Sequence, residues 1–201
     1  MRRPHLSLLA VRHRYGTITR SRGRTDIIML NKIKLRLHKE LGIPADYDST
    51  TDMPAYAQTD DLVEVGPNLV GRMQRLTPTA AAKWQQMVDA ATTDGIRLLI
   101  VSGYRSFGYQ ADQIRNKLDK GQSIEKILEV NAAPGYSQHH TGEAIDIATP
   151  GSRPLTEEFE DSEAFAWLTE NAKIYEFSMT YPRDNALGII YEPWHWALGA
   201  G

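Results

Sequence analysis

Two short segments in the C-terminal half of the chain carry the residues best suited to chemistry. Residues 137–146 read Ser-Gln-His-His-Thr-Gly-Glu-Ala-Ile-Asp, and residues 192–196 read Glu-Pro-Trp-His-Trp. A catalytic zinc site takes three protein ligands of the His and Asp/Glu type and leaves a fourth position to water. The ion makes that water acidic enough to attack a carbonyl near neutral pH. If the two segments meet in space, they supply the parts of a hydrolase.

The first segment predicts an aspartate that faces away from the core. Alternation along a strand puts Asp146 on the face opposite to Ile145 and Ile147. The isoleucines belong in the core, so Asp146 faces a side where small neighbours leave room for a metal ion. His139 and His140 are adjacent and point in different directions, so we expect only one of them to be a ligand. The spacing does not choose between them.

The second segment predicts a glutamate and a histidine that share a cavity. Glu192 and His195 are three residues apart and would face opposite sides of a straight strand. Pro193 is poorly tolerated inside a helix or a central strand, and a kink there would turn both side chains to one side. Trp194 and Trp196 flank His195 and are expected to shield the site from bulk water.

A third feature is Arg105, which follows a short apolar run at residues 96–101. Loops at the ends of strands often carry functional residues. An arginine in such a loop can bind a carboxylate or a developing oxyanion. The alternative is an ordinary surface arginine.

The spacing of these residues resembles the signature of a known family. The pattern is Ser137-x-His139-x-x-Gly142-x-Ala144-x-Asp146 followed by Glu192-x-x-His195. It resembles the zinc D-alanyl-D-alanine carboxypeptidases of the VanY and VanX type, which include related L,D-carboxypeptidases and share a fold with the hedgehog signalling domain. Residues 102–106, 133–137 and 191–195 are also similar to the VanY branch.

The resemblance implies roles for individual side chains. It implies that one zinc ion per chain is bound by His139, Asp146 and His195, which selects the first of the two adjacent histidines. Glu192 would be the catalytic base, and Arg105 would steady the carbonyl or carboxylate oxygens of the substrate. Further contacts with the substrate would come from Ser137, Gln110 and Tyr136.

The substrate that the resemblance implies is the D-Ala-D-Ala end of a peptidoglycan stem peptide or muropeptide. An L,D-carboxypeptidase or a peptidoglycan endopeptidase would use the same metal ligands, and these motifs do not separate the three activities. A non-catalytic zinc-containing cell-wall binding module is an alternative of another class, because the hedgehog fold permits it. The presence of Glu192 and an open fourth ligand position favour an enzyme.

The rest of the sequence predicts the elements that position these residues. Apolar spacing and capping residues predict helices at 31–41, 77–94, 107–119, 123–130 and 156–172. Strands are predicted at 96–101, 143–149, 177–181 and 188–196, with the last two forming a hairpin. Residues 44–71 are predicted to be irregular. Because helices and strands mix without a regular βαβ alternation, we predict an α+β fold with a mainly antiparallel sheet flanked by helices.

Composition limits the chemistry. A chain of 201 residues with 41% hydrophobic residues can bury a core without covalent staples. It contains no cysteine, so any metal must bind to His, Asp or Glu. Such a mixed set favours zinc, with Mn, Fe, Co or Ni as the alternatives. No apolar run has the length of a transmembrane segment.

Charge is distributed unevenly along the chain. Residues 1–39 carry 11 Lys/Arg against Asp26, whereas residues 40–201 carry 12 Lys/Arg against 24 Asp/Glu. The acidic body is unlike a nucleic-acid binder, so we expect no such partner. For the basic head we expect a flexible leader, with a nucleic-acid or membrane-binding arm as the alternative.

These patterns also predict how the chain is organised. We expect a leader at 1–28, an N-terminal helix and linker at 29–59, and a zinc peptidase domain at 60–201. The apolar run at 6–11 is too short for the core of a secretory signal, so the sequence as written predicts the cytoplasm, whereas the implied substrate points to the cell envelope. The sequence does not predict an oligomeric state.

Overall fold

A four-stranded antiparallel sheet organises the structure. The computed structural model describes residues 24–199, so most of the predicted leader, residues 1–23, lies outside the described residues. The strands pair in the order β3-β4-β6-β5, with bounds Leu99–Ser102, Ala144–Ala148, His195–Leu198 and Phe177–Met179. All three pairings are antiparallel, and this confirms the predicted α+β class.

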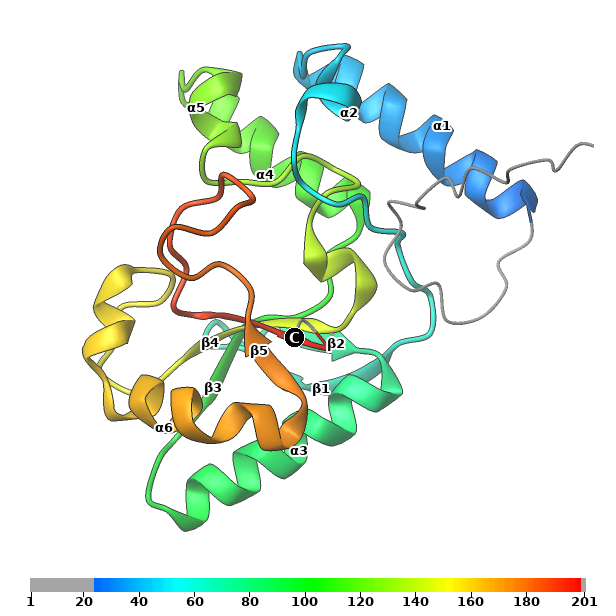
Figure 1. Cartoon of the computed structure of the whole chain (residues 1–201). Helices are drawn as coiled ribbons and strands as arrows, with labels where there is room; N and C mark the ends of the chain where they lie inside the picture. Colours follow the sequence, from blue (N-terminus) through cyan, green and yellow to red (C-terminus); the bar gives the residue numbers. More distant parts are fainter. Residues whose placement is uncertain (1–23, 200–201) are drawn as a thin grey trace, which may run out of the picture.

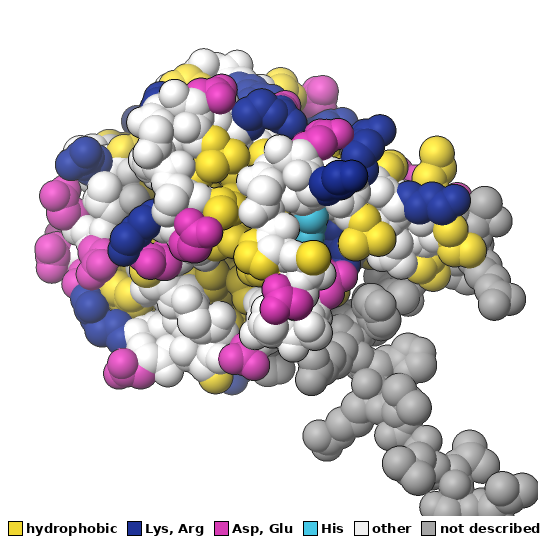
Figure 2. Space-filling model, turned by 90° about the horizontal axis from the view of Figure 1, so that it is seen from above, with side chains coloured by type: hydrophobic (Ala, Val, Ile, Leu, Met, Phe, Trp, Pro, Cys, Tyr) yellow, Lys and Arg dark blue, Asp and Glu magenta, His cyan; other side chains and the backbone are white. Residues whose placement is uncertain are grey.

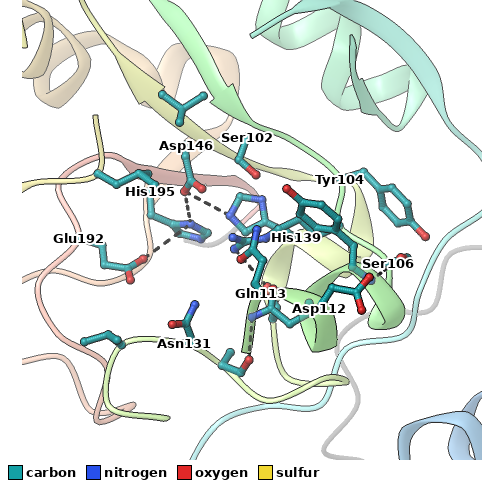
Figure 3. A pocket seen from close by; sticks show the side chains of 18 of the residues that line it. Ser102, Tyr104, Ser106, Asp112, Gln113, Asn131, His139, Asp146, Glu192 and His195 are labelled. Carbon is teal, nitrogen blue, oxygen red and sulfur yellow. Dashed lines mark hydrogen bonds and ion pairs between the residues drawn. The ribbon is translucent and has the colours of Figure 1, made fainter. Parts of the chain in front are cut away.

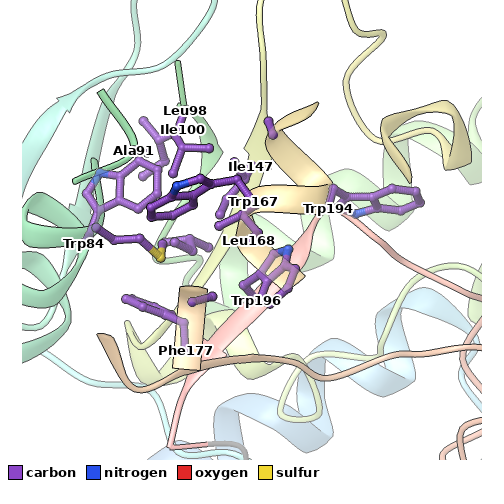
Figure 4. Packing of buried hydrophobic residues seen from close by; sticks show 14 of the residues in the cluster. Trp84, Ala91, Leu98, Ile100, Ile147, Trp167, Leu168, Phe177, Trp194 and Trp196 are labelled. Carbon is purple, nitrogen blue, oxygen red and sulfur yellow. The ribbon is translucent and has the colours of Figure 1, made fainter. Parts of the chain in front are cut away.

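Helices α3 (Pro78–Thr93) and α6 (Glu163–Asn171) cover one face of the sheet (Figure 1). Thr77 caps α3 by accepting a hydrogen bond from Ala80 N, and Pro78 suits the first turn. The buried residues of α3 lie at helical spacing and meet the sheet in the larger hydrophobic core (Figure 4). Ile145 and Ile147 of β4 are fully buried in this core, and each contributes about 1.5–3 kcal/mol through burial.

The remaining helices lie on the other side of the sheet (Figure 1). They are α1 (Arg24–Leu41), α2 (Tyr47–Thr50), α4 (Phe107–Leu118) and α5 (Ile124–Leu128). A second hydrophobic cluster joins Leu37 and Leu41 of α1 to Phe107 and Ile114 of α4. Within the described residues, no helix is both long and apolar enough to cross a membrane.

The N-terminal part of the chain is more regular than predicted. Helix α1 begins at Arg24, seven residues before the predicted start. The segment predicted to be irregular contains α2 and the strand β1 (Val63–Pro67), which pairs with β2 (Met73–Leu76). Gly66 and Pro67 usually break regular structure, so the sequence did not predict this hairpin. A register shift between Glu64 and Gly66 accommodates them in the strand. The division into leader, linker and domain stays a prediction.

Two predicted elements are shorter than expected. The predicted helix 156–172 is divided into the 3₁₀ turn η2 (Glu157–Asp161), α6 and the turn η3 (Ala172–Tyr175). The break lies at Ser162, whose hydroxyl accepts from Phe165 N and so starts α6 as an N-cap. The predicted strand 96–101 begins only at Leu99, because Ile96 N still donates to Ala91 O at the end of α3.

The predicted C-terminal hairpin has a longer connection than expected. Strand β6 begins at His195 and not at residue 188, because Pro193 and Trp194 form a turn that cannot join the ladder. Strands β5 and β6 nevertheless pair, with Phe177 opposite Leu198. Tyr181, Ile190 and Glu192 of this connection line a cavity.

Candidate metal centre and active site

The register of the sheet brings an aspartate and a histidine together. Asp146 on β4 lies directly opposite His195 on β6, and its side chain points away from Ile145 and Ile147 into a cavity (Figure 3). The predicted alternation along β4 is therefore confirmed. Asp146 Oδ1 lies 3.0 Å from His195 Nδ1.

A 3₁₀ turn supplies the third side chain. His139 lies on η1 (Gln138–Thr141), directly before β4, and its Nε2 is 3.2 Å from Asp146 Oδ1. Gly142 ends the turn with a φ of +71°, and a Cβ there would lie 2.9 Å from Leu62 Cδ2, so only glycine fits. One ligand atom from each of His139, Asp146 and His195 lies within 4.8 Å of the others, which is a group that could hold a metal ion.

The hydrogen bonds around this group test whether a cation fits. His139 Nδ1–H donates to the Gly103 carbonyl at 2.7 Å, and His195 Nε2–H donates to Gln138 Oε1 at 2.9 Å. These bonds fix both tautomers, so each neutral ring turns an unprotonated nitrogen toward Asp146. Three acceptor atoms then converge with no proton between them, and this arrangement suits a cation.

Burial and neighbouring groups keep His139 and Asp146 in the protonation states that metal binding needs. All three side chains are almost completely buried. Burial lowers the pKa of His139 to about 4. For Asp146 burial alone would raise the pKa, but the neighbouring histidines and the Arg105 guanidinium hold it well below its usual range. A neutral His139 imidazole beside an ionised Asp146 is ready to coordinate a metal ion.

Glu192 lies at the edge of this group. The turn at Pro193 places Glu192 and His195 on one side, as predicted, with Glu192 Oε2 4.0 Å from His195 Nδ1 (Figure 3). Burial raises the pKa of Glu192 to about 7. A carboxyl group with a pKa near neutrality can both accept and return a proton, which is the requirement for a general acid–base.

The two predicted tryptophans differ in position. Trp194 lines the cavity, which is where the predicted shielding from water requires it to be. Both rings pack in the large core, but Trp196 does not line the cavity and donates its Nε1–H to the Pro193 carbonyl. The two positions are not equivalent, because Trp194 lies in the turn before β6, whereas Trp196 lies on β6, where alternation turns it to the face opposite His195.

His140 takes a structural position beside the candidate ligands. It is fully buried and packs against Phe107, its Nε2 accepts from Gly135 N at 3.1 Å, and its Nδ1–H donates to Arg105 O at 2.6 Å. Both nitrogens are therefore used within the fold, and burial lowers the pKa of His140 to about 3. His140 thus ties two loops of the site together.

Replacement of His140 by alanine is expected to lower the free energy of unfolding and to spare metal binding. The substitution leaves the Gly135 N–H and the Arg105 carbonyl without partners and opens a cavity, which costs about 2–4 kcal/mol. Urea unfolding measures the loss, and elemental analysis measures the metal. A variant that folds normally but has lost its metal would contradict this assignment.

Arg105 and Ser137 lie next to the metal group. Arg105 N donates to His139 O, and Arg105 Nη2 is 3.5 Å from Ser137 Oγ. Arg105 Nε is buried and has no hydrogen-bond partner. Gln110 is 1% exposed and donates Nε2–H to Ala132 O, while its Oε1 is buried without a partner. Unpartnered buried polar atoms in a cavity wall are available to a ligand.

Tyr136 is placed differently from the other predicted substrate contacts. Ser137 and Gln110 are among the described residues that line the cavity, whereas Tyr136 is not. Its hydroxyl donates to Asp48 Oδ1 at 2.7 Å, and its ring packs against Tyr47 in the second hydrophobic cluster. The structure therefore does not bring Tyr136 to the cavity wall, because Asp48 and Tyr47 engage its hydroxyl and its ring elsewhere.

Sequence reasoning missed two residues next to His195. Gln138 orients the ring of His195, and Thr180 in turn donates to Gln138 Oε1. Tyr181 lines the cavity with its ring 4.8 Å from that of His195, and burial raises its pKa above the usual range. Gln138 directly precedes His139 and His140, but no sequence pattern predicts its hydrogen bond to His195, which lies 57 positions away.

The fold and this site define a candidate metallopeptidase: a buried His-Asp-His group with a glutamate beside it at the base of a cavity of about 1120 Å³. The chain belongs to the VanY D-alanyl-D-alanine carboxypeptidase family, whose model matches residues 73–199. This confirms the resemblance drawn from the motifs.

Known proteins with similar sequences and structures agree. The chain is 28% identical over 170 residues to a D-alanyl-D-alanine carboxypeptidase of Enterococcus faecalis, a match that covers 80% of this chain and 56% of the relative. It is 30% identical to the LdcB L,D-carboxypeptidase, with a TM-score of 0.64 and 72% of each chain covered. The chain spans about half the length of the curated relatives it matches.

Two solved structures of VanY are also similar. VanYB in complex with D-alanine-D-alanine is 30% identical, with a TM-score of 0.56 and coverage of 71% of this chain and 79% of that chain. A mutant of the D,D-pentapeptidase VanY in complex with Zn(II) is 27% identical, with a TM-score of 0.56 and coverage of 71% and 82%.

Proposed function

We propose that the protein is a zinc-dependent carboxypeptidase that removes the terminal D-alanine from peptidoglycan stem peptides ending in D-Ala-D-Ala. The observation that carries the proposal is the convergence of three buried ligand atoms beside a glutamate whose pKa is near neutrality. The similar VanY structures contain Zn(II) or D-alanine-D-alanine. By its substrate, we place the proposed activity in the cell envelope.

The metal would be held by His139, Asp146 and His195, whose oriented nitrogens and ionised carboxylate fit a zinc ion. When bound, zinc would polarise the scissile carbonyl and make water in the site acidic enough to attack it at neutral pH. Gln138 and the Gly103 carbonyl keep the two imidazoles in the required tautomers.

Glu192 would move the proton during the reaction. It lies within the cavity, its pKa is close to neutral, and it is not part of the group of three ligand atoms. Its carboxylate accepts a proton from the attacking water and returns it to the leaving amine of the terminal residue. Trp194 and Tyr181 line the same cavity and restrict the entry of bulk water.

Arg105 would bind oxygen atoms of the substrate. Its backbone is fixed by the hydrogen bond from Arg105 N to His139 O, and its guanidinium lies near Ser137 in the cavity wall. A guanidinium held in this way can donate to the carbonyl oxygen as negative charge develops, or to the terminal carboxylate. Ser137 and Gln110 offer further polar atoms to the peptide.

Removal of the Arg105 side chain is expected to lower kcat/KM by about 10²–10³ without loss of metal, because one donor to the developing oxyanion disappears. Steady-state kinetics and elemental analysis on Arg105→Ala check this result. Arg97→Ala, at an exposed arginine after α3, is the matched control and should behave like the parent protein. An unchanged kcat/KM in Arg105→Ala would remove Arg105 from the site.

An L,D-carboxypeptidase is the second candidate, because the similar LdcB structure has a TM-score of 0.64.

One experiment tests both functions. The zinc-loaded protein is incubated with synthetic tri-, tetra- and pentapeptide stems, with and without a chelator, and the products are identified by mass spectrometry. Our proposal predicts that the pentapeptide loses one D-alanine and that chelation stops the reaction. Cleavage of the tetrapeptide alone would favour the second candidate, and no cleavage would refute both.

A further inference from the structure

The cavity extends well beyond the metal centre. Its wall follows α4, which begins directly after Arg105 at the metal centre and ends at Leu118. A helix of 12 residues is about 18 Å long. A terminal dipeptide spans only about 7 Å, so the cavity has room for several further residues of a peptide. Gln113 of α4 and Asn131 after α5 face this outer part (Figure 3).

Lys117, near the end of α4, lies in the wall of this outer part. Its side chain is partly buried, and its Nζ donates to Asn131 Oδ1. Burial lowers the pKa of Lys117, and among residues 24–199 it forms no ion pair that would offset the loss of hydration. An ammonium group has three donors, so two remain for another acceptor.

The neighbouring amide adds donors of its own. Because Asn131 Oδ1 accepts from Lys117, the orientation of the amide is fixed and Asn131 Nδ2 carries its two N–H groups elsewhere. A cationic donor and an amide donor thus lie side by side in the cavity wall. This pair matches a carboxylate, which accepts hydrogen bonds on two oxygens.

Most charged residues in the cavity wall outside the metal centre are cationic. Arg72 and Lys120 also line the cavity. Asp112, the one acidic residue among the described lining residues outside the metal centre, forms an ion pair with Arg115. The cavity lining outside the metal centre is therefore mainly cationic, although residues 40–201 carry 24 Asp/Glu against 12 Lys/Arg. A local field of opposite sign to the body attracts anionic groups.

We propose that Lys117 and Asn131 form a subsite for a carboxylate on the peptide substrate, about three residues upstream of the bond that is cleaved. The inference rests on the proposed function and deepens it. Gln110 and Lys117 are seven residues apart on α4, or about 10 Å along the helix axis. An extended peptide advances about 3.3 Å per residue, so a distance of about 10 Å corresponds to about three residues of the peptide.

Paired peptides test this subsite. Each peptide ends in D-Ala-D-Ala and carries, at the second, third or fourth residue upstream of the scissile bond, either a free carboxylate or the corresponding carboxamide. We expect the parent protein to prefer the carboxylate at one of these positions by about tenfold in kcat/KM, mainly through KM, because the interaction binds the substrate away from the reacting atoms. Titration calorimetry with the Glu192→Gln variant should show the same preference in Kd.

Variants at Lys117 complete the test. Lys117→Met keeps the apolar stem and should lose the preference for the carboxylate with little change in kcat on the carboxamide peptide, whereas Lys117→Arg should retain the preference. Lys173→Met, at an exposed lysine on η3 that does not line the cavity, is the matched charge control and should retain it too. Circular dichroism confirms that each variant is folded.

The outcomes separate the two proposals. Equal cleavage of all carboxylate and carboxamide pairs by the parent protein, or an unchanged preference in Lys117→Met, would overturn the subsite while the carboxypeptidase function stands. If no peptide is cleaved and none is bound, the proposed function itself fails and the subsite fails with it.

Discussion

Replacement of Glu192 by glutamine is expected to lower kcat by about 10²–10⁴ while KM and metal content stay close to those of the parent protein. Glutamine keeps the shape of the side chain but cannot accept a proton, and a positioned acid–base contributes a factor of this size. Metal content should persist because Glu192 lies outside the group formed by His139, Asp146 and His195. Single-turnover kinetics on a D-Ala-D-Ala peptide and elemental analysis measure the two effects.

The chain offers a control for the change in charge. Glu143 is a partly buried carboxylate whose pKa burial also raises, but it does not line the cavity. Glu143→Gln should therefore turn over normally. An unchanged kcat in Glu192→Gln would refute the assignment of the base, and a loss of metal in that variant would indicate that Glu192 is a ligand.

The central part of the site could be predicted because local rules determine it. Alternation along β4 fixes Asp146 opposite to two core isoleucines, and the antiparallel register then brings His195 beside it. Pro193 forces a turn, which explains why Glu192 shares the cavity with His195. These inferences need only backbone periodicity and the known limits of proline.

The choice between His139 and His140 shows where local rules end. Adjacent residues in a turn can point in many directions, and the structure decides between them through non-local bonds. The carbonyl of Gly103 holds His139, while the N–H of Gly135 and the carbonyl of Arg105 hold His140. Spacing left both histidines open, and only the resemblance to a family selected the first.

The position of Tyr136 also depends on partners far away in the sequence. The Tyr136 hydroxyl donates a hydrogen bond to Asp48, which lies 88 positions away in the sequence. Asp48 in turn forms an ion pair with Lys34 of α1. The family model begins at residue 73, so these partners lie outside the part of the chain that the family motifs describe. A motif match therefore suggested a substrate contact where this chain has a packing contact.

Replacement of His195 by alanine is expected to lower zinc affinity by at least about a hundredfold and to abolish turnover. Loss of a residue that only orients a ligand already costs 10–100-fold in metal affinity, and His195 is one of the three candidate ligands itself. The substitution also removes the contact of His195 with Asp146 and its hydrogen bond to Gln138. Competition with a chelator at buffered zinc concentrations measures the affinity.

His140→Ala is the control that separates ligation from burial. Both histidines are buried, both hydrogen-bond to other residues, and they lie in the same part of the molecule. If the imidazoles act only through packing, both variants lose zinc in proportion to their loss of stability. If His195 is a ligand, its variant loses zinc even where it remains folded, whereas His140→Ala keeps zinc despite a lower free energy of unfolding. Normal zinc affinity in His195→Ala would refute the proposed metal centre, because the two remaining donors do not complete a catalytic zinc site.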